Sequence, residues 1–325
     1  MNAIIVLWHQ YVPRGITSYY RLYMEFFKRW ANVWKDEFDV IYLVDGGWDI
    51  TQKDLDDIGK CILLNPGDAH QWIHFANVIP GIPAENILLL DNDMVVYKKG
   101  LIKDCFDKLN NGKKIVSIFD GSGGMNEAIW KKIPTLAKIK CLRMSAYFTA
   151  IKKELMEYQN FEPIRFEPGV YLQEIDYTTK EGDWYEAFGG ATARILSQLK
   201  EEEIEVIPND ANSFYLDDSG IYGDQKVEPS GCYHIRNWSL PVHLINDKKL
   251  DLENYKRQIP ALPKREVCRL FAWLWTINEI CGSKTNGLES EVSEILEDFK
   301  VSPEKWDEYI IKFREYHSWI KILQS

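Results

Sequence analysis

The stretch NILLLDNDMVV, residues Asn86–Val96, decides how the fold of this chain is interpreted. Asn86–Leu90 has the apolar character of a buried strand, Asp91 and Asp93 follow it directly, and the apolar pair Val95–Val96 comes next. Two carboxylates one residue apart, at the carboxyl end of a parallel strand, can share a divalent cation, and oxygen ligands suit Mg²⁺ or Mn²⁺. Asp and Asn are also ordinary turn residues. The motif therefore predicts a metal site only together with the rest of the chain.

Strand-like and helical segments alternate on both sides of this motif. Short apolar runs predict strands, and apolar residues spaced at three and four predict helices. The predicted strands are Ala3–Trp8, Phe38–Val44, Cys61–Leu64, Asn86–Leu90, Lys114–Phe119, Met144–Ile151, Glu205–Pro208 and Gly231–Ile235, and the predicted helices are 18–34, Asp54–Ile58, Ala69–Val78, Gly100–Leu109, a segment within Gly121–Lys140, and Trp184–Leu199. This order predicts an α/β fold with a mostly parallel sheet flanked by helices. Such open sheets bind ligands at the carboxyl ends of their strands.

The character of the chain changes near Leu250, where helical patterns replace the alternation. Arg265–Cys281 is apolar and rich in Trp, a second helix follows around Leu288–Phe299, and Ser302 with Pro303 begins a third. We expect a catalytic domain over residues 1–248, with a nucleotide-binding half at about 1–100 and an acceptor half at about 101–248. Residues 249–325 form a helical C-terminal extension. Its helices lack the basic faces typical of membrane-surface helices, so peripheral membrane contact is the less favoured interpretation.

The composition excludes several classes of protein. The chain has 325 residues, 46% of them hydrophobic, and a formal net charge of −10, which argues against nucleic acid as a partner. No apolar run reaches the length of a membrane span, and Met1–Leu7 is interpreted as a first strand and not as a signal peptide. The six cysteines form no C-x-x-C pair, which indicates buried thiols and favours a cytoplasmic location.

Polar residues at other predicted strand ends could complete a nucleotide site. His9 and Tyr11 follow the first strand and could stack on a base, while Asp45 ends the second strand and could accept hydrogen bonds from a ribose or a base. His234 follows the last strand, where an imidazole could complete the coordination begun by Asp93, and Arg236 could neutralise a diphosphate. For each of these residues a purely structural role is an open alternative.

A general base is the remaining candidate. Asp183, with Glu186 as its substitute, lies at the start of a predicted helix and could take a proton from an acceptor hydroxyl. The alternative is that these acidic residues simply stabilise a first helical turn.

In this order, the motifs resemble those of GT-A-fold glycosyltransferases, and most closely those of the large inverting family. The segments that carry the resemblance are Val44–Asp49, Leu88–Asp93 with its D-x-D pattern, Ala146–Ile151, Asp183 with the helix to Leu199 and the strand Ile204–Pro208, and His234. The likeness covers roughly residues 1–245. The chain departs from the family where a second Asp is replaced by Gly46 and where a Glu-Asp pair reads Gly182-Asp183.

The resemblance implies a metal-dependent transferase that moves a sugar from a UDP- or GDP-sugar to a hydroxyl acceptor in glycan or glycoconjugate biosynthesis. Asp91, Asp93 and His234 would hold Mn²⁺ or Mg²⁺, and Asp91 and Asn92 would also contact the donor nucleotide. Inversion is slightly favoured, and retention is the alternative. Two other classes stay open: a sugar nucleotidyltransferase, although His9–Gly15 has a single glycine where that class carries a Gly-rich loop, and a non-catalytic carbohydrate-binding protein.

Overall fold

The computed structural model describes most of the chain in two compact units. The described residues are 1–9, 18–46, 50–65, 75, 77–120, 143–157, 159, 164–165, 168–169, 171–172, 177–178, 180–181, 184–185, 187–196, 198–207, 214–223, 231–235, 264–282 and 288–324. One unit, here called the sheet unit, comprises Met1–His9, Trp34–Met94 and Lys98–Asn209, and the other, the helical unit, comprises Gln10–Val33, Val95–Tyr97 and Asp210–Ser325. The boundary predicted at residue 248 stays a prediction about domains.

Within the described residues, the sheet unit contains seven strands in one sheet, together with short strand pairs and two longer helices. Its elements are β1 (Asn2–His9), β2 (Val40–Gly46), η1 (Gln52–Leu55), β3 (Cys61–Leu64), η2 (Ile79–Gly81), β4 (Asn86–Asp91), α3 (Leu101–Asn110), β6 (Ile115–Asp120), β7 (Arg143–Lys152), η3 (Lys153–Leu155), β8 (Ile164–Arg165), β9 (Tyr171–Leu172), β10 (Tyr177–Thr178), β11 (Trp184–Tyr185), α6 (Ala187–Leu196), η5 (Glu201–Glu203) and β12 (Ile204–Ile207). The predicted α/β class is therefore confirmed.

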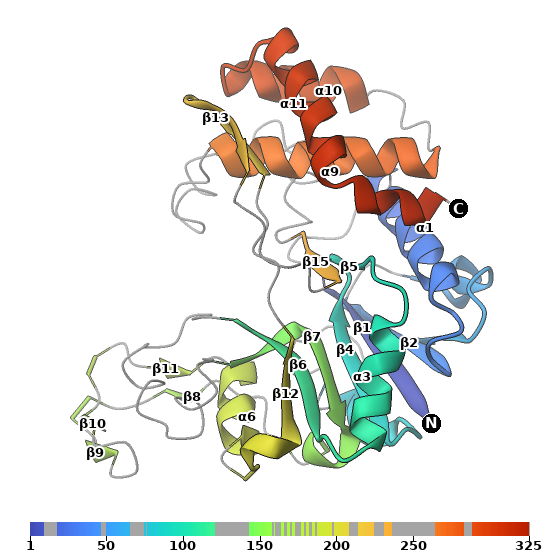
Figure 1. Cartoon of the computed structure of the whole chain (residues 1–325), viewed down its shortest axis with the longest axis vertical. Coiled ribbons are helices and arrows are strands. Elements are labelled where there is room, and N and C mark those ends of the chain that lie inside the picture. The colour runs from blue at the N-terminus through green and yellow to red at the C-terminus, as the bar shows by residue number, and fades with distance from the viewer. Residues whose placement is uncertain are drawn as a thin grey trace. The chain divides into compact units, whose positions relative to one another are not determined.

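The strand order of the main sheet is β12-β6-β7-β4-β1-β2-β3 (Figure 1). β1 pairs in parallel with both β2 and β4, β2 pairs in parallel with β3, and β12 pairs in parallel with β6. Only β7 runs against its neighbours β4 and β6 within this sheet. The chain therefore builds outward from β1 to β3 on one side and then continues with β4 on the other side of β1. This reversal is a topological switch point, the place where open α/β sheets bind ligands.

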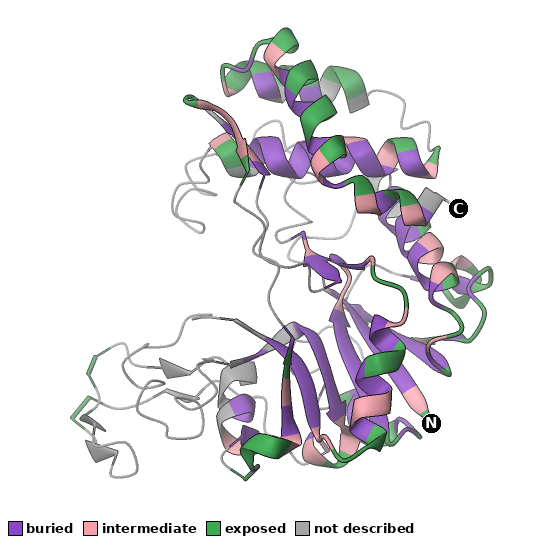
Figure 2. Cartoon of the chain, in the orientation of Figure 1, coloured by how far each residue is buried: buried purple, intermediate pink, exposed green. Residues whose placement is uncertain are grey.

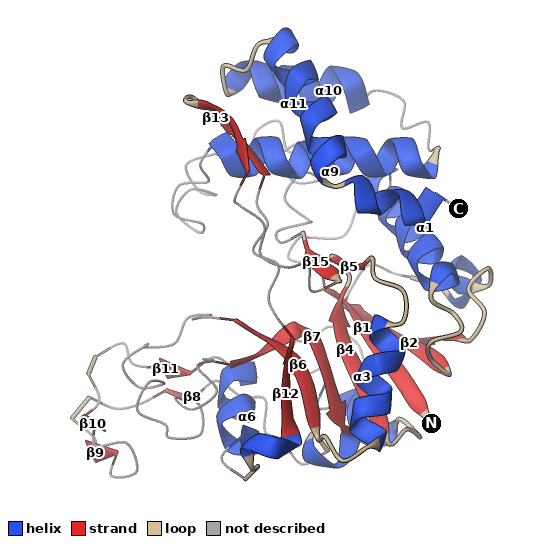
Figure 3. Ribbon diagram, in the orientation of Figure 1, coloured by secondary structure: helices blue, strands red, loops and turns tan. Residues whose placement is uncertain are grey.

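Helices cover both faces of this sheet, because its strands are apolar on both sides. One buried cluster takes alternate residues of the strands, such as Ile5, Tyr42 and Leu89, and adds Ala191 and Ile195 of α6. Helix α3 packs against β6 and β7, and none of its residues belongs to that cluster, so it covers the opposite face (Figure 3).

The helical unit is built around one buried helix. Its elements are α1 (Ser18–Val33), β5 (Met94–Val96, of which only Met94 belongs to the sheet unit), the hairpin β13 (Phe214–Asp217) and β14 (Gly220–Gly223), β15 (Cys232–His234), α9 (Lys264–Cys281), α10 (Leu288–Asp298), α11 (Pro303–Tyr316) and η6 (Ser318–Gln324). Val267–Leu274 of α9 is buried on every side of the helix (Figure 2), because α1, β13, α11 and η6 all contact α9. The predicted C-terminal helices are thus confirmed, including Ser302 as the N-cap of α11, which accepts from the Lys305 amide.

Several predicted elements differ from the observed ones. Trp184 and Tyr185 form strand β11, paired with β8, and helix α6 begins only at Ala187, so the single helix predicted from Trp184 is wrong at its start. The helix predicted at Asp54–Ile58 is a 3₁₀ turn, Gln52–Leu55. The β13–β14 hairpin was not predicted, although DDSG between apolar residues is a hairpin signal. The helix predicted within 121–140 and most of Ala69–Val78 lie outside the described residues.

Two further predictions concern the thiols and the membrane. Of the described cysteines, all but the half-buried Cys281 are buried, and burial raises the pKa of the Cys61 and Cys268 thiols to about 12. Among the described residues, no helix combines the length and the apolar character that crossing a bilayer requires.

Candidate metal centre

The acidic turn lies at the switch point of the main sheet. β4 ends at Asp91, whose register partner in β1 is Leu7, and Asn92 and Asp93 form the turn that follows. The four residues before Asp91 are all but fully buried, because β4 is covered on both faces and paired on both edges. The backbone hydrogen bonds between β4 and its two neighbouring strands therefore fix the position of the turn that carries the two carboxylates. Asp91 and Asn92 are half-buried, and Asp93 is 8% exposed.

A third carboxylate lies at the same edge of the sheet. Asp45 is the register partner of Trp8, so it lies at the carboxyl end of β2, directly before the last residue Gly46, on the other side of β1 from Asp91. Its side chain is 2% exposed, and its Oδ2 accepts a hydrogen bond of 3.1 Å from the Ile50 amide. A buried carboxylate held by a backbone amide fits the predicted contact with a ribose or a base, and it fits equally a carboxylate that closes its own turn.

His234 ends the short strand β15, which pairs with β5, the strand that begins directly after Asp93. The Tyr97 amide donates to the Gly231 carbonyl at 2.9 Å, which continues this pairing. Around this local pairing, one ligand atom each of Asp91, Asp93 and His234 lie within 4.8 Å of one another. The structure thus brings together the three residues predicted as metal ligands.

The chemistry of this group suits a divalent cation. The two carboxylates provide hard oxygen donors, and the imidazole provides a borderline nitrogen donor. First-row ions such as Mn²⁺ bind both kinds of donor, whereas Mg²⁺ binds chiefly the carboxylate oxygens. The donor set therefore fits the predicted ion.

Other predicted site residues can be placed only in part. His9 is the last residue of β1 and pairs with Gly46, which puts its backbone at the same edge of the sheet. Tyr11, Asp183, Glu186 and Arg236 lie outside the described residues, so their predicted roles stay predictions.

Two residues that hold the His234 segment were not predicted. The buried Arg269 of α9 donates to the carbonyl of Ile235, and Trp319 of η6 contacts the rings of Tyr97 and Tyr233. No local pattern marks them, since an Arg in a helix and a Trp near the C-terminus have many ordinary uses. The apolar stripe of the last helix is the only sequence signal that points towards this packing.

Comparison with known proteins finds similarity at the level of structure alone. No protein-family model matches the chain. No curated protein matches it. Among solved structures it is similar to glucosyl-3-phosphoglycerate synthase from Mycobacterium tuberculosis in complex with Mn²⁺ and UDP-glucose, at 12% identity over 64% of this chain and 68% of that chain, with a TM-score of 0.41.

Two other glycosyltransferases are similar to different extents. The mannosyltransferase PcManGT from Pyrobaculum calidifontis, in complex with GDP-Man and Mn²⁺, covers 99% of this chain and 85% of its own at 10% identity, with a TM-score of 0.38. The galactosyltransferase LgtC, in complex with donor and acceptor sugar analogues, covers 49% of this chain and 60% of its own at 14% identity, with a TM-score of 0.33. At such values the likeness carries no residue assignment, and the site is argued from this chain alone.

Proposed function

We propose that the protein is a metal-dependent glycosyltransferase that moves a sugar from a nucleotide-diphosphate sugar to a hydroxyl acceptor. The observation that carries this proposal is the group formed by Asp91, Asp93 and His234, whose ligand atoms lie within 4.8 Å of one another. The group follows the carboxyl end of β4, beside the switch point of a mostly parallel sheet. Metal ligands at that position suit a substrate that carries phosphates, since Mg²⁺ and Mn²⁺ commonly take phosphate oxygens as further ligands.

The proposed metal ligands are Asp93 and His234, with Asp91 as a third ligand or as a contact to the ribose. A bound Mn²⁺ or Mg²⁺ supplies Lewis-acid stabilisation of the diphosphate charge. The protein residues bind and orient: the carboxylates would fix the diphosphate end of the donor, at the end of a strand whose preceding residues are buried. A preorganised charged site of this kind stabilises developing charge without reorganising.

The nucleoside is assigned to the neighbouring strand ends. Asp45 would accept hydrogen bonds from the ribose or the base, His9 and Tyr11 would stack on the base, and Asn92 would contact the donor beside the metal. Arg236 would neutralise the leaving diphosphate. Asp45 supports this assignment most directly, because it is buried at the carboxyl end of β2, the strand that pairs directly with β1.

The acceptor side follows from the resemblance to the inverting family. Asp183, with Glu186 as its substitute, would take the proton from the attacking hydroxyl if the enzyme inverts. In a retaining enzyme the same residues would orient the acceptor or the sugar. The proposed setting is glycan or glycoconjugate biosynthesis in a reducing compartment, which accords with the buried thiols.

The test is donor hydrolysis by the full chain. We expect that incubation with Mn²⁺ and a panel of UDP- and GDP-sugars releases free nucleotide diphosphate from one donor, measured by ion-exchange chromatography. Asp93→Asn keeps the shape of the side chain and removes its charge, and we expect it to lower turnover at least about 100-fold, the upper range for losses around a metal site.

The matched control is Asp56→Asn, which makes the same change at an exposed residue of the sheet unit and should leave turnover unchanged. Turnover that survives both Asp93→Asn and chelation would overturn the metal role. No binding of any nucleotide by the unmodified chain would favour the carbohydrate-binding alternative.

A further inference from the structure

The strand that carries His234 is too short to be held by its own ladder. β15 spans Cys232–His234 and forms a two-stranded sheet with β5 alone. Isolated two-stranded pairs are marginally stable in water. A metal ligand must be held in a defined geometry, so other contacts must fix His234.

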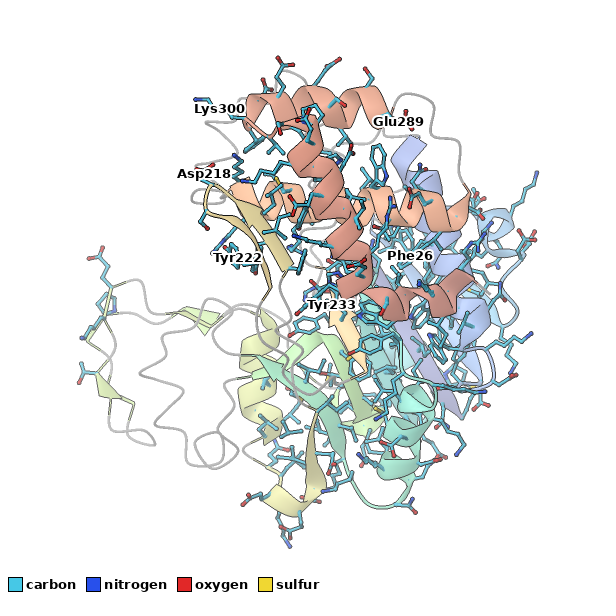
Figure 4. The ribbon with its side chains drawn as sticks, turned by 45° about the horizontal axis from the view of Figure 1, so that its top comes forward. Phe26, Asp218, Tyr222, Tyr233, Glu289 and Lys300 are labelled. Carbon is cyan, nitrogen blue, oxygen red and sulfur yellow. The ribbon has the colours of Figure 1, made fainter. Side chains whose placement is uncertain are left out.

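The residue before His234 is anchored among aromatic side chains of the C-terminal helices. The Tyr233 side chain is 5% exposed and contacts the rings of Trp273 at 5.2 Å, His317 at 5.4 Å and Trp319 at 5.9 Å between centroids (Figure 4 labels Tyr233). Because successive side chains of a strand point to opposite faces, anchoring Tyr233 on one face fixes the direction in which His234 points.

The residue after His234 is anchored by a buried cation. Arg269 of α9 is 3% exposed, and its guanidinium donates to the carbonyl of Ile235, which is itself fully buried. Burying a guanidinium is unfavourable unless its donors are satisfied, and a charged donor makes a stronger hydrogen bond than a neutral one. Arg269 thus holds the backbone one residue beyond His234.

Trp319 contacts strand β15 and the residue that directly follows strand β5. Its ring stacks on Tyr97, which follows β5, with centroids 4.3 Å apart and planes 25° apart, and it also contacts Tyr233 of β15. Tyr97 is bonded in turn to Gly231, through its amide at 2.9 Å and through its hydroxyl, which accepts from the Gly231 amide at 3.4 Å. The Trp319 side chain of η6 therefore joins β15 to the residue that follows β5, close to the predicted ligands.

We propose that Arg269 and Trp319 are positioning residues for His234, so that the C-terminal helices complete the metal site by fixing its histidine ligand. The inference rests on the proposed metal site. It gives the C-terminal helices a role in the reaction that does not require them to touch the donor or the acceptor. Residues that orient a metal ligand in this way usually affect metal affinity about 10–100-fold.

The test measures Mn²⁺ binding by the full chain, through the electron paramagnetic resonance signal of free Mn²⁺. We expect Trp319→Leu and Arg269→Met to weaken Mn²⁺ binding about 10–100-fold, with His234→Ala as the reference for complete loss of this ligand. Tyr309→Phe is the matched control, because Tyr309 is also buried in the helical unit but donates to Phe214 of β13 at 2.8 Å. It should bind Mn²⁺ as the unmodified chain does.

A second readout separates positioning from general loss of structure. Pulsed resonance spectra of bound Mn²⁺ should show coupling to an imidazole ¹⁴N nucleus in the unmodified chain and in Tyr309→Phe. The coupling should be absent in His234→Ala and reduced in the Trp319 and Arg269 variants. Arg269→Lys and Trp319→Phe provide milder variants if the first pair does not fold, and smaller losses in the same order are expected.

The outcomes distinguish the two proposals. If the unmodified chain binds Mn²⁺ with ¹⁴N coupling and the folded Trp319 and Arg269 variants keep both affinity and coupling, the positioning inference is overturned while the metal site stands. If the unmodified chain binds no Mn²⁺, the metal site is overturned, and the inference with it.

Discussion

The two regions that supply the predicted metal ligands are supported in different ways. Asp91 and Asp93 follow β4, which has hydrogen-bonded neighbours on both edges within a seven-stranded sheet. His234 ends a three-residue strand with one neighbour, β5. Its support comes from side chains of α9 and η6 and from His317, the residue between α11 and η6. The carboxylates are placed by backbone ladders, and the histidine is placed by side-chain packing.

The difference has a physical consequence. The ladder of β4 fixes the position of the carboxylates through many repeated backbone hydrogen bonds, so the loss of one side chain elsewhere moves them little. A strand held by a few aromatic contacts and one buried Arg depends on each of them. The histidine side of the site should therefore be the more sensitive to mutation away from the ligands themselves.

The largest expected effect tests this difference directly. Trp273 is fully buried in α9 and contacts Tyr233, so Trp273→Ala should lower the free energy of unfolding by about 3–5 kcal/mol, and it should also weaken Mn²⁺ binding. Urea denaturation and Mn²⁺ titration at low denaturant measure the two effects separately.

The comparison variant is Ile115→Ala in β6, with an expected loss of about 2–5 kcal/mol. Ile115 is fully buried. It lies level with Ile87, since both residues pair with Ile151 of β7. Ile87 is four positions before Asp91, so Ile115 lies towards the end of the sheet that is remote from the metal ligands. It should destabilise the chain without weakening Mn²⁺ binding. Equal losses of Mn²⁺ affinity in both variants would show that the two regions do not differ in the way described.

The same contrast explains which features could be predicted from the sequence. The apolar run before Asp91 and the β-α alternation were sufficient for the parallel sheet and for carboxylates at a strand end, because both depend on local pattern. The antiparallel insertion of β7 between β4 and β6 was not predicted, since no local pattern states which strand is its neighbour. For His234, the resemblance suggested the role, but Arg269 and its partner Ile235 are 34 positions apart and Trp319 is more distant still. Such pairings arise only in the folded chain.

A smaller effect concerns the pH dependence of the helical unit. Burial lowers the pKa of the His317 imidazole from 6.5 to about 3, and the charge of Arg269 adds to this, while Nδ1 donates to the Phe313 carbonyl at 3.0 Å. The unfolded chain takes up a proton below about pH 6.5 and the folded chain does not until about pH 3. Stability is therefore lost as the pH falls through this range, by about 2 kcal/mol between pH 8 and pH 5.

His317→Asn keeps a donor for the Phe313 carbonyl and has no group that titrates in this range. The difference in unfolding free energy between the unmodified chain and this variant, measured by urea denaturation at pH 8 and at pH 5, should change by that amount. A difference that is the same at both pH values would mean that His317 is not held neutral, and the packing around Tyr233 would then be looser than described.

The smallest expected effect lies in the sheet unit and tests whether side chains distant in the sequence matter there too. Glu37 accepts from the first amides of α3: Gly100 at 2.7 Å, Ile102 at 3.1 Å and Lys103 at 3.3 Å. Gly100 has φ +85° at the N-cap and supplies no side chain, so a carboxylate 63 positions away replaces the usual cap. Glu37→Gln retains an acceptor but loses the charge at the positive end of the helix, and it should lower the free energy of unfolding by about 0.5–1 kcal/mol. Raised salt should reduce that loss, because it screens an interaction between a charge and a dipole. A loss several times larger, or one that also weakens Mn²⁺ binding, would mean that the sheet unit depends on single long-range contacts as strongly as the His234 region does.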